Sequence, residues 1–404
     1  MKLFLSLQWL VVAVSALATR TPNVADEIKA LVSPSSSVAV DLRVRWSAFN
    51  APVPAVVVNV TTEKDVAAVT FDLGTNGVLI NLAGLNAVTF SKSKTEATIG
   101  GGVIIGDAIK AANAAGVLVQ TGNCNCLGAL GAILGGGYGN LMGEVGFGVD
   151  NVLSMRVVVA SGETLTVSPT SHPDLFWAFR GAGPNFGIVT SATVRAWPTS
   201  TQERTAWIMN LAVSPWQLTQ VAQAIQDLPL KPEQVVFLVL TNKGPPSNAP
   251  AVLVTGFLRQ GTEETGRAAF APLYALGPTA NSSSAKAPNS AMLVERYNLT
   301  KAQDAPRGST ALQEALRRDA FAQAIVIPWY TDAALDAEAL DFGRKVRDIW
   351  SYTGPATKNP TYVNFAHGDE TAEAIYGSSL SQLRRLKKEW DPLGAFNQWF
   401  KIGS

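Results

Sequence analysis

Short apolar runs of strand length alternate with helix-like segments along the first half of the chain. The strand-like runs are residues 54–60, 77–82, 96–102 and 188–195, with a further pair, 151–160 and 164–168, around the turn Ser161–Gly162. The helix-like segments are residues 63–71, 105–115 and 174–180. Thr61 or Thr62 can cap the first helix, and Gly116 suits the end of the second. This mixture predicts an α+β fold.

The pattern changes near Thr201. Strand-like runs at 235–240 and 251–257 are separated there by a loop rich in Pro, Ser and Asn, and a similar polar loop covers 280–290. We therefore expect a second domain over residues 201–353, with the end of the chain returning to the first domain.

The N-terminus has the order of a secretory signal peptide. Lys2 is followed by an apolar run over residues 3–14 and by small residues up to Ala18. That run is too short to span a bilayer comfortably, and an N-terminal anchor is the alternative. We expect a secreted protein without residues 1–18 and without membrane attachment. Three glycosylation sequons would matter after export: Asn59, Asn281 and Asn298.

Composition narrows the range of partners. The 404 residues are 47% hydrophobic and 16% charged, which is enough to bury one large core or two. Lys and Arg number 32 against 31 Asp and Glu, so the formal charge of +1 offers no basic stripe for nucleic acid. We expect a globular monomer that binds a small molecule, with no metal site.

The stretch Thr121–Gly128, which runs into the glycine-rich Leu134–Gly139, carries the clearest chemical signal. Backbone without side chains can approach a flat or phosphorylated ligand closely, so the stretch indicates a cofactor cradle. The alternative is a tight turn with two buried thiols. Cys124 and Cys126 are too close in sequence for an unstrained disulfide, which leaves burial or covalent attachment to a cofactor.

In their order and spacing, the motifs of this chain resemble those of the FAD-linked oxidoreductases of the berberine bridge enzyme type, in a fungal subtype. These enzymes belong to the vanillyl-alcohol oxidase and p-cresol methylhydroxylase flavoprotein superfamily. The motifs span most of the chain: Gly122–Gly128, Leu134–Gly139, Gly146–Asn151, Asp174–Thr190, Tyr362–Phe365, Trp390–Pro392 and Phe396–Asn397.

The resemblance implies a two-part FAD-binding domain of the p-cresol methylhydroxylase type at residues 50–200. An inserted α+β substrate domain would cover 201–353, and a C-terminal segment at 358–404 would return to the FAD domain. By its place before Leu127 and Gly128, Cys124 resembles the cysteine that bonds the flavin ring, whereas Cys126 does not. Such a bond raises the reduction potential of the ring. The resemblance assigns further FAD contacts to Gly128, Gly135, Gly136, Gly137, Tyr138, Gly139, Asp150, Asn151, Gly187, Val189, Asn364 and Asn397.

One departure from the family lies after the first helix. Relatives have a further strand there and an Arg-x-Gly-Gly-His-Ser loop, which holds the pyrophosphate and supplies a tethering histidine. Here the chain runs from Phe71 directly into Asp72–Gly77, as if about 20 residues were missing. Neither His172 nor His367 takes the histidine's place. We expect weakened FAD binding and unpaired strand edges, or else a misplaced exon boundary in the gene model.

A second departure is Phe365, where relatives that abstract a proton commonly carry tyrosine. A phenyl ring cannot do acid–base chemistry. Tyr362 and His367 are the nearest catalytic candidates, with an ordinary core tyrosine and a surface histidine as the alternatives.

The resemblance thus implies a secreted FAD-dependent oxidoreductase that takes hydride from a small organic substrate and passes electrons to oxygen, in fungal secondary metabolism. The competing hypothesis is a degenerate relative, or the product of a faulty gene model, with weak or no FAD binding and no catalysis. A nicotinamide-dependent dehydrogenase is rejected, because no strand–turn–helix unit with a downstream acidic residue frames Gly181, Gly183 and Gly187. The sequence does not identify the substrate.

Overall fold

The computed structural model of the chain describes residues 21–39, 54–69, 77–243, 247–281, 290–330, 332–352, 360–398 and 400–403. The expected signal peptide at 1–18 lies outside these residues, as do Phe71 and the rest of the shortened connection up to residue 76.

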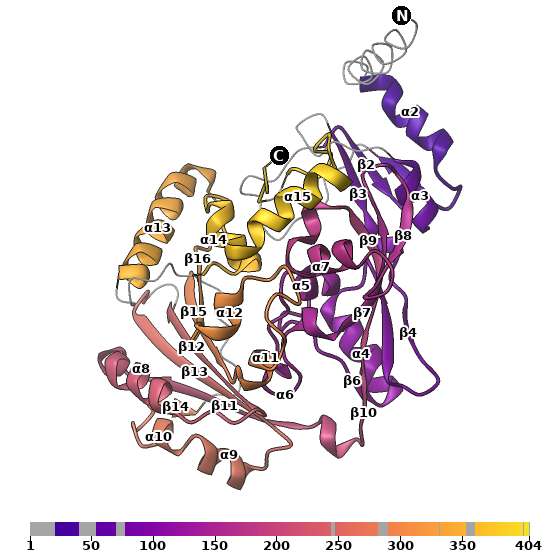
Figure 1. Cartoon of the computed structure of the whole chain (residues 1–404). Helices are drawn as coiled ribbons and strands as arrows, with labels where there is room; N and C mark the ends of the chain where they lie inside the picture. The colour runs from indigo at the N-terminus through magenta and orange to yellow at the C-terminus, as the bar shows by residue number, and fades with distance from the viewer. Residues whose placement is uncertain are drawn as a thin grey trace, which may run out of the picture.

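The N-terminal half of the molecule contains a three-stranded and a five-stranded sheet (Figure 1). In the first sheet, β2 pairs with β1 antiparallel and with β3 parallel, and in the second, the order β4-β5-β9-β7-β8 is antiparallel throughout. The strands are β1 (Ser37–Ala39), β2 (Val56–Asn59), β3 (Val78–Asn81), β4 (Val88–Phe90), β5 (Glu96–Gly100), β7 (Val152–Val158), β8 (Thr164–Val167) and β9 (Ile188–Arg195), with β6 (Val117–Leu118) and β10 (Trp197–Pro198) as a separate pair.

Helices of this half share a hydrophobic core with the five-stranded sheet. Val157, Phe179 and Phe186 are fully buried in it. Local signals set the helix ends: Thr62 and Asp65 form a capping box on α3, and Gly116 closes α4 in the left-handed conformation at φ 74°. The helices are α2 (Thr21–Leu31), α3 (Glu63–Ala68), α4 (Ile105–Ala115), α5 (Ala129–Leu134), α6 (Met142–Val145) and α7 (Pro173–Ala182).

The second half is built on a six-stranded antiparallel sheet in the order β14-β11-β13-β12-β15-β16. Helices α8, α9 and α10 cover the face that points away from the N-terminal half (Figure 1). The elements are β11 (Ala206–Val213), α8 (Leu218–Asp227), β12 (Gln234–Asn242), β13 (Pro250–Arg259), α9 (Glu263–Ala269), α10 (Ala271–Tyr274), β14 (Ala280–Asn281), β15 (Ala291–Tyr297), α11 (Thr300–Gln303), α12 (Glu314–Arg318), β16 (Gln323–Ile327) and α13 (Asp336–Tyr352).

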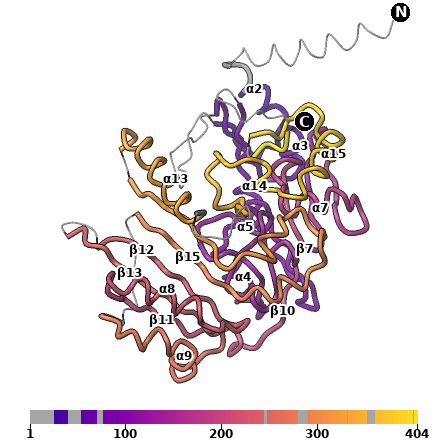
Figure 2. Tube along the Cα trace, turned by 60° about the vertical axis from the view of Figure 1, so that its left-hand side comes forward, coloured from indigo at the N-terminus to yellow at the C-terminus, as the bar shows by residue number. Residues whose placement is uncertain are grey.

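The end of the chain packs on the first half. It forms α14 (Ala372–Tyr376) and α15 (Leu380–Trp390), which lie beside α5 and α7 in Figure 2. Leu383 and Leu386 of α15 join the core around the five-stranded sheet, and Tyr376 Oη donates a hydrogen bond to the carbonyl oxygen of Phe400. The α+β prediction is therefore confirmed, together with the strands, the hairpin at Gly162 and the helices after Glu63, Ile105 and Asp174.

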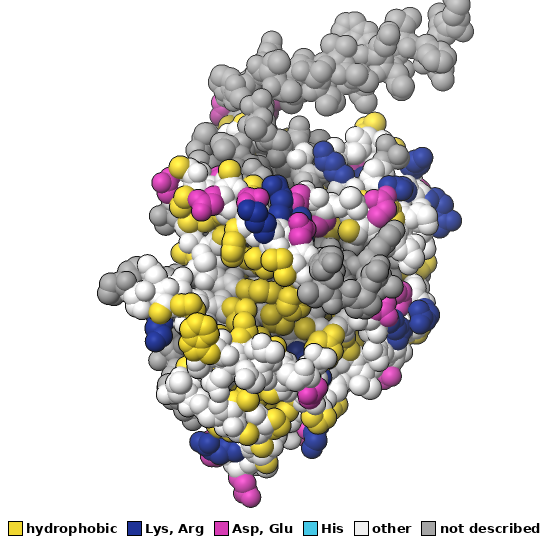
Figure 3. All heavy atoms as spheres, turned by 90° about the vertical axis from the view of Figure 1, so that its left-hand side faces the viewer, with side chains coloured by type: hydrophobic (Ala, Val, Ile, Leu, Met, Phe, Trp, Pro, Cys, Tyr) yellow, Lys and Arg dark blue, Asp and Glu magenta, His cyan; other side chains and the backbone are white. Residues whose placement is uncertain are grey.

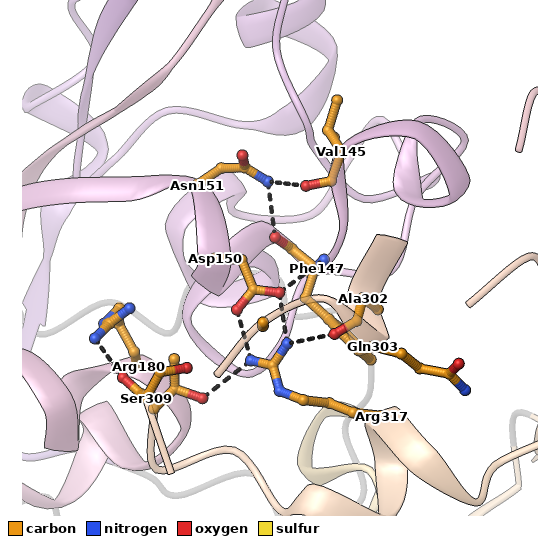
Figure 4. Close-up of polar contacts among 12 residues, drawn as sticks. Val145, Phe147, Asp150, Asn151, Arg180, Ala302, Gln303, Ser309 and Arg317 are labelled. Carbon is orange, nitrogen blue, oxygen red and sulfur yellow. Dashed lines mark hydrogen bonds and ion pairs between the residues drawn. The ribbon is translucent and has the colours of Figure 1, made fainter. Parts of the chain in front are cut away.

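A buried ion pair joins the two halves. The guanidinium of Arg317 in α12 donates to both carboxylate oxygens of Asp150, at 2.5 and 2.6 Å, and to Thr310 Oγ1 at 3.0 Å. Figure 4 shows Asp150 and Arg317 facing each other across the two halves. The Arg317 side chain is only 1% exposed. A second ion pair, Glu144 with Arg259, joins α6 to β13.

Replacing Arg317 by Met should lower the free energy of unfolding by about 3 kcal/mol, because the variant leaves the Asp150 carboxylate largely buried without its counter-charge. Chemical denaturation followed by fluorescence measures this change. Lys110→Met, which removes an exposed ion pair with Asp107, is the matched control and should cost about 0.5 kcal/mol or less. Equal losses in the two variants would contradict the role assigned to the buried pair.

Candidate functional site

The loop from Asn123 to Gly128 is exposed but held in place by backbone hydrogen bonds. The amides of Ile105 and Gly106, at the start of α4, donate to the carbonyls of Leu127 and Asn125, each at 2.9 Å. Leu127 in this loop is 43% exposed. The loop therefore presents a preformed surface.

Cys124 and Cys126 both lie on this exposed surface, so the alternative of two buried thiols is wrong. Their Sγ atoms are 3.2 Å apart as free thiols. Partial burial and the hydrogen bond with the neighbouring Cys126 thiol raise the pKa of Cys124. Because the thiolate is the reactive form, Cys124 needs a proton acceptor before it can form a covalent bond.

The glycines around this loop are either constrained by their surroundings or backbone angles, or open to free space. A Cβ on Gly139 would lie 1.8 Å from the carbonyl oxygen of Thr121, and one on Gly135 would lie 2.2 Å from Asn364 Oδ1, so close packing requires these glycines. Gly136 and Gly137 adopt positive φ angles of 143° and 82°, which favour glycine. In contrast, a Cβ on Gly128 would meet nothing within 4 Å. Open space therefore adjoins the exposed loop at Gly128.

A chain of hydrogen bonds leads from the loop to a buried carboxylate. Asn123 Nδ2 donates to Tyr297 Oη at 2.7 Å, and Tyr297 Oη donates to Glu295 Oε2 at 2.6 Å. Glu295 is 7% exposed, and burial raises its pKa. Both residues lie on β15, on the face of the six-stranded sheet that meets Tyr138. A raised pKa makes the Glu295 carboxylate a stronger base than an exposed carboxylate.

Sequence reasoning missed Glu295. Its signal is a single acidic residue within an apolar strand, Ala291–Tyr297, two positions before a tyrosine. Alternation places Glu295 and Tyr297 on one face, but only the docking of the two halves shows that this face is buried.

The structure separates the two catalytic candidates. Tyr362 is 5% exposed, and its Oη accepts from the Gly137 amide at 3.2 Å and from Asn364 Nδ2 at 2.9 Å. Burial raises its pKa to about 12, which makes it a weak acid–base group at neutral pH. His367 is exposed, and it lines a cavity of about 440 Å³ together with Asn364.

Tyr138 lies at the centre of an aromatic cluster. Its ring contacts Phe147, Tyr297 and Tyr362 at centroid distances between 4.7 and 5.5 Å. Gln323 of β16 donates to Tyr138 Oη at 2.8 Å. Tyr138 therefore connects the glycine-rich turn to the six-stranded sheet.

Other residues of the expected cofactor set have partners within the chain. Asn151 donates to the carbonyls of Val145 and Phe147, and the Asp150 carboxylate is held by Arg317. A Cβ on Gly187 would lie 2.4 Å from the carbonyl oxygen of Val158, and Val189 pairs with Val157 in the sheet.

Asn397 lines a different cavity from Asn364, beside Lys387 and Lys401. The structure thus gathers the loop residues Cys124 and Gly128, the Gly135–Gly139 turn, and Asn364, but not Asn397.

Two sequon asparagines are already hydrogen-bonded through the nitrogen that would carry a glycan. Asn59 Nδ2 donates to Ser37 Oγ, and Asn298 Nδ2 donates to the carbonyl of Leu230. The side chain of Asn281 lies outside the described residues. Glycosylation at these positions stays a prediction.

Comparison with known proteins identifies the class. The model for an FAD binding domain matches residues 66–168, and the model described as berberine and berberine like matches residues 361–399. The fold is also that of Physcomitrella patens BBE-like 1, with a TM-score of 0.79, 19% identity, and coverage of 92% of this chain and 98% of that one. A 6-hydroxy-D-nicotine oxidase from Arthrobacter nicotinovorans gives a TM-score of 0.74 at 20% identity, with the same coverage. The chain therefore shares the fold of these proteins and contains a segment that matches an FAD binding domain.

Sequence relatives define the family. FAD-linked oxidoreductase OXR1 of Pyricularia oryzae is 30% identical over 433 residues, covering 87% of this chain and 84% of the relative. FAD-linked oxidoreductase hasG of Aspergillus fumigatus is 29% identical over 444 residues, covering 89% and 93%. The chain belongs to the FAD-linked oxidoreductases of the berberine bridge enzyme type, and FAD is its cofactor.

Two features near the exposed loop are compatible with a bound cofactor. A Cβ on Gly128 would meet nothing within 4 Å, and the buried side-chain oxygen of Gln120 lacks a hydrogen-bond partner within the described part of the chain. The Nε2 of the same side chain donates to the Gly137 carbonyl, so the unpaired acceptor lies beside the glycine-rich turn. A buried acceptor of this kind is costly unless a ligand or water donates to it.

Two absences concern the described residues only. No helix there is long and apolar enough to cross a membrane. No group of three or more His, Cys, Asp or Glu side chains in the same residues could hold a metal ion.

Glu295→Gln should change how stability depends on pH. Burial raises the folded-state pKa of Glu295 above its ordinary value of about 4.3. The contribution of Glu295 to the free energy of unfolding is therefore fully present below about pH 4.3 and is lost as the pH rises through the raised pKa. The melting temperature of the natural protein should therefore fall relative to that of Glu295→Gln as pH rises from 4 to 8.

Glu163→Gln, at an exposed turn, is the matched control and should track the natural protein at every pH. A constant difference between the natural protein and Glu295→Gln across this range would show that Glu295 is not held in a buried environment.

Proposed function

We propose that this chain oxidises a small organic molecule at a carbon–hydrogen bond, with molecular oxygen as the electron acceptor. Bound FAD would supply a two-electron carrier between the substrate carbon and that acceptor. We further propose secretion and a role in fungal secondary metabolism, following the N-terminal pattern and the fungal relatives.

The observation that carries this proposal is the path of hydrogen bonds from the exposed loop to Glu295. Asn123 is adjacent to Cys124 in the chain, and it contacts Tyr297, which contacts Glu295. Cys124, which we propose as the anchor of the cofactor ring, and Glu295, which we propose as the proton acceptor, are thereby connected through hydrogen bonds in a fixed arrangement. Such fixed positions reduce the reorganisation needed during reaction.

Each residue then has a proposed role. Cys124 anchors the cofactor ring, Gly128 gives the ring room, and the buried oxygen of Gln120 accepts a hydrogen bond from it. Glu295 takes the proton that leaves the substrate hydroxyl or amine, and Tyr297 orients the carboxylate. Tyr362 and Asn364 position the glycine-rich turn, because Tyr362 Oη accepts from the Gly137 amide and Asn364 bears against Gly135.

Domain boundaries belong to the same proposal. We assign FAD binding to residues 50–200 with 358–404, and substrate binding to residues 201–353. The support is that α15 shares a core with α7, whereas the six-stranded sheet has a core of its own.

A second candidate is a family member that binds FAD weakly and does not catalyse. It is favoured by the short connection between α3 and β3. The alignment with the Aspergillus fumigatus relative runs over 444 positions, more than the 404 residues of this chain, so the relative carries segments without a counterpart here. Missing pyrophosphate contacts would each cost about 1.5–3 kcal/mol.

An absorbance spectrum of the purified protein, before and after acid precipitation, tests the proposal. We expect a flavin spectrum that stays with the precipitated chain, and oxygen uptake when an oxidisable substrate is added. A folded but colourless protein would contradict the proposal and support the second candidate. Colour released into the supernatant would retain FAD binding but refute the covalent bond.

Cys124→Ala should abolish flavin fluorescence on the denatured chain, whereas Cys126→Ala should keep it. The two side chains lie 3.2 Å apart on the same exposed loop, so Cys126→Ala is a closely matched control for local disturbance. Denaturing gel electrophoresis under ultraviolet light measures the result. Equal fluorescence of the two variants would refute the assignment to Cys124.

A further inference from the structure

The only two cysteines of the chain lie beside each other on the exposed loop. The Sγ atoms of Cys124 and Cys126 are 3.2 Å apart, whereas a disulfide holds its sulfur atoms about 2.0 Å apart. The two atoms therefore need to approach by only about 1.2 Å to form a bond. Both side chains are exposed, so an oxidant in solution can reach them.

A tight turn holds the two thiols in this arrangement. The amide of Leu127 donates to the carbonyl of Cys124 at 3.2 Å, which places Asn125 and Cys126 at the centre of the turn. The carbonyls of Asn125 and Leu127 also accept hydrogen bonds from amides at the start of α4. Because the backbone is already fixed, little conformational entropy is lost when one thiol meets the other.

A disulfide across this turn would be easily reduced. Only Asn125 separates the two cysteines, so the ring that the bond closes is small and the bond is strained. Strained and exposed disulfides have higher reduction potentials and are the labile ones in proteins. A loop this short also gains little stability from being closed. The pair is therefore suited to reversible oxidation and not to a structural cross-link.

The pair lies outside the cavity that Asn364 and His367 line. The walls of this cavity come from the end of β16, from α13 and from the segment 364–369. On the face that carries α13, Figure 3 shows hydrophobic side chains gathered in a hollow. Among the residues that the structure describes, none from the loop Asn123–Gly128 lines the cavity. A reagent can therefore reach the thiols without entering it.

Cys124 is also the proposed anchor of the cofactor ring. A sulfur atom that is bonded to Cys126 carries no thiol and cannot at the same time bond the ring. The two bonds are therefore mutually exclusive at this cysteine. The secretion proposed above would take the chain through an oxidising compartment, where disulfides form and persist.

We propose that Cys124 and Cys126 form a reversible disulfide, and that this oxidised state blocks covalent attachment of the cofactor ring. The oxidant is a small disulfide such as glutathione disulfide. The second half of the inference rests on the proposed function, because it names a regulation of the proposed anchor. The first half stands without it.

Two thiol–disulfide exchanges balance the reaction. The thiolate of one cysteine attacks glutathione disulfide, which forms a mixed disulfide and releases one glutathione thiolate. The thiolate of the other cysteine attacks the protein sulfur of this mixed disulfide and releases the second glutathione thiolate. The released thiolates take up the two protons that the cysteines lost. The chain loses two electrons, and the glutathione disulfide gains them.

The first test uses the purified protein from a riboflavin-limited host, so that both thiols are free at the start. The protein is equilibrated with glutathione disulfide, quenched with acid and alkylated, and the mass of the intact chain is measured. We expect the loss of both free thiols and, without alkylation, a mass about 2 Da below that of the reduced chain. An excess of reduced glutathione should restore both thiols.

Cys126→Ser is the matched control, because it removes one thiol and changes the size of the side chain little. Cys124 of this variant should accumulate the mixed disulfide with glutathione, whereas the natural protein should resolve it. Three results would overturn the disulfide: free thiols that persist in the natural protein, a glutathione adduct on it as abundant as on the variant, or a disulfide-linked dimer in non-reducing electrophoresis.

The second test offers FAD to oxidised and reduced samples of the natural protein after gel filtration, and it measures flavin fluorescence on the denatured chain. We expect at least about tenfold less fluorescence in the oxidised sample, and recovery after reduction. Equal fluorescence in the two samples would overturn the block. If the disulfide forms but neither sample acquires fluorescence, the proposed anchor and the second half of the inference are refuted, and the disulfide stands.

Discussion

The buried ion pair between Asp150 and Arg317 fixes how the two halves of the molecule meet. The Arg317 side chain is 1% exposed, so loss of either partner would leave the other charge uncompensated in a poorly hydrated place. Asp150 follows closely on the glycine-rich turn, and Arg317 lies shortly before β16. The pair therefore holds the sheet face with Glu295 against Tyr138, and the arrangement of the candidate site depends on it.

Glycine has two different uses in this site. At Gly135 and Gly139 its missing side chain lets one part of the protein approach another, because a Cβ would collide with Asn364 or Thr121. At Gly128 no part of the described chain takes up the freed space. A dense run of glycines therefore marks close packing within the protein as much as contact with a ligand, and only the structure separates the two.

The sequence predicted the fold class and most strands because apolar periodicity and turn residues are local signals. Gly116 and Thr62 mark helix ends that depend only on their neighbours in the chain. Glu295 could not be predicted in this way, because its hydrogen-bond partner Tyr297 packs on Tyr138, which lies far away in the chain. The cavity wall on α13 was missed for a related reason: its polar, charged sequence resembles a solvated helix until the ion pairs with Asp369 are seen.

The proposed anchor at Cys124 would hold the ring of the cofactor, whereas the segment that the family resemblance expects after α3 would hold its pyrophosphate. Parallel pairing of β2 with β3 closes the three-stranded sheet despite the short connection, and it leaves β3 as an edge strand within the described part of the chain. A cofactor bonded through its ring cannot dissociate, so fewer contacts at the pyrophosphate would slow its loading more than they reduce its final occupancy. Weak initial binding and the proposed attachment would therefore be compatible in one protein, and the raised pKa of Cys124 would make that attachment depend on pH.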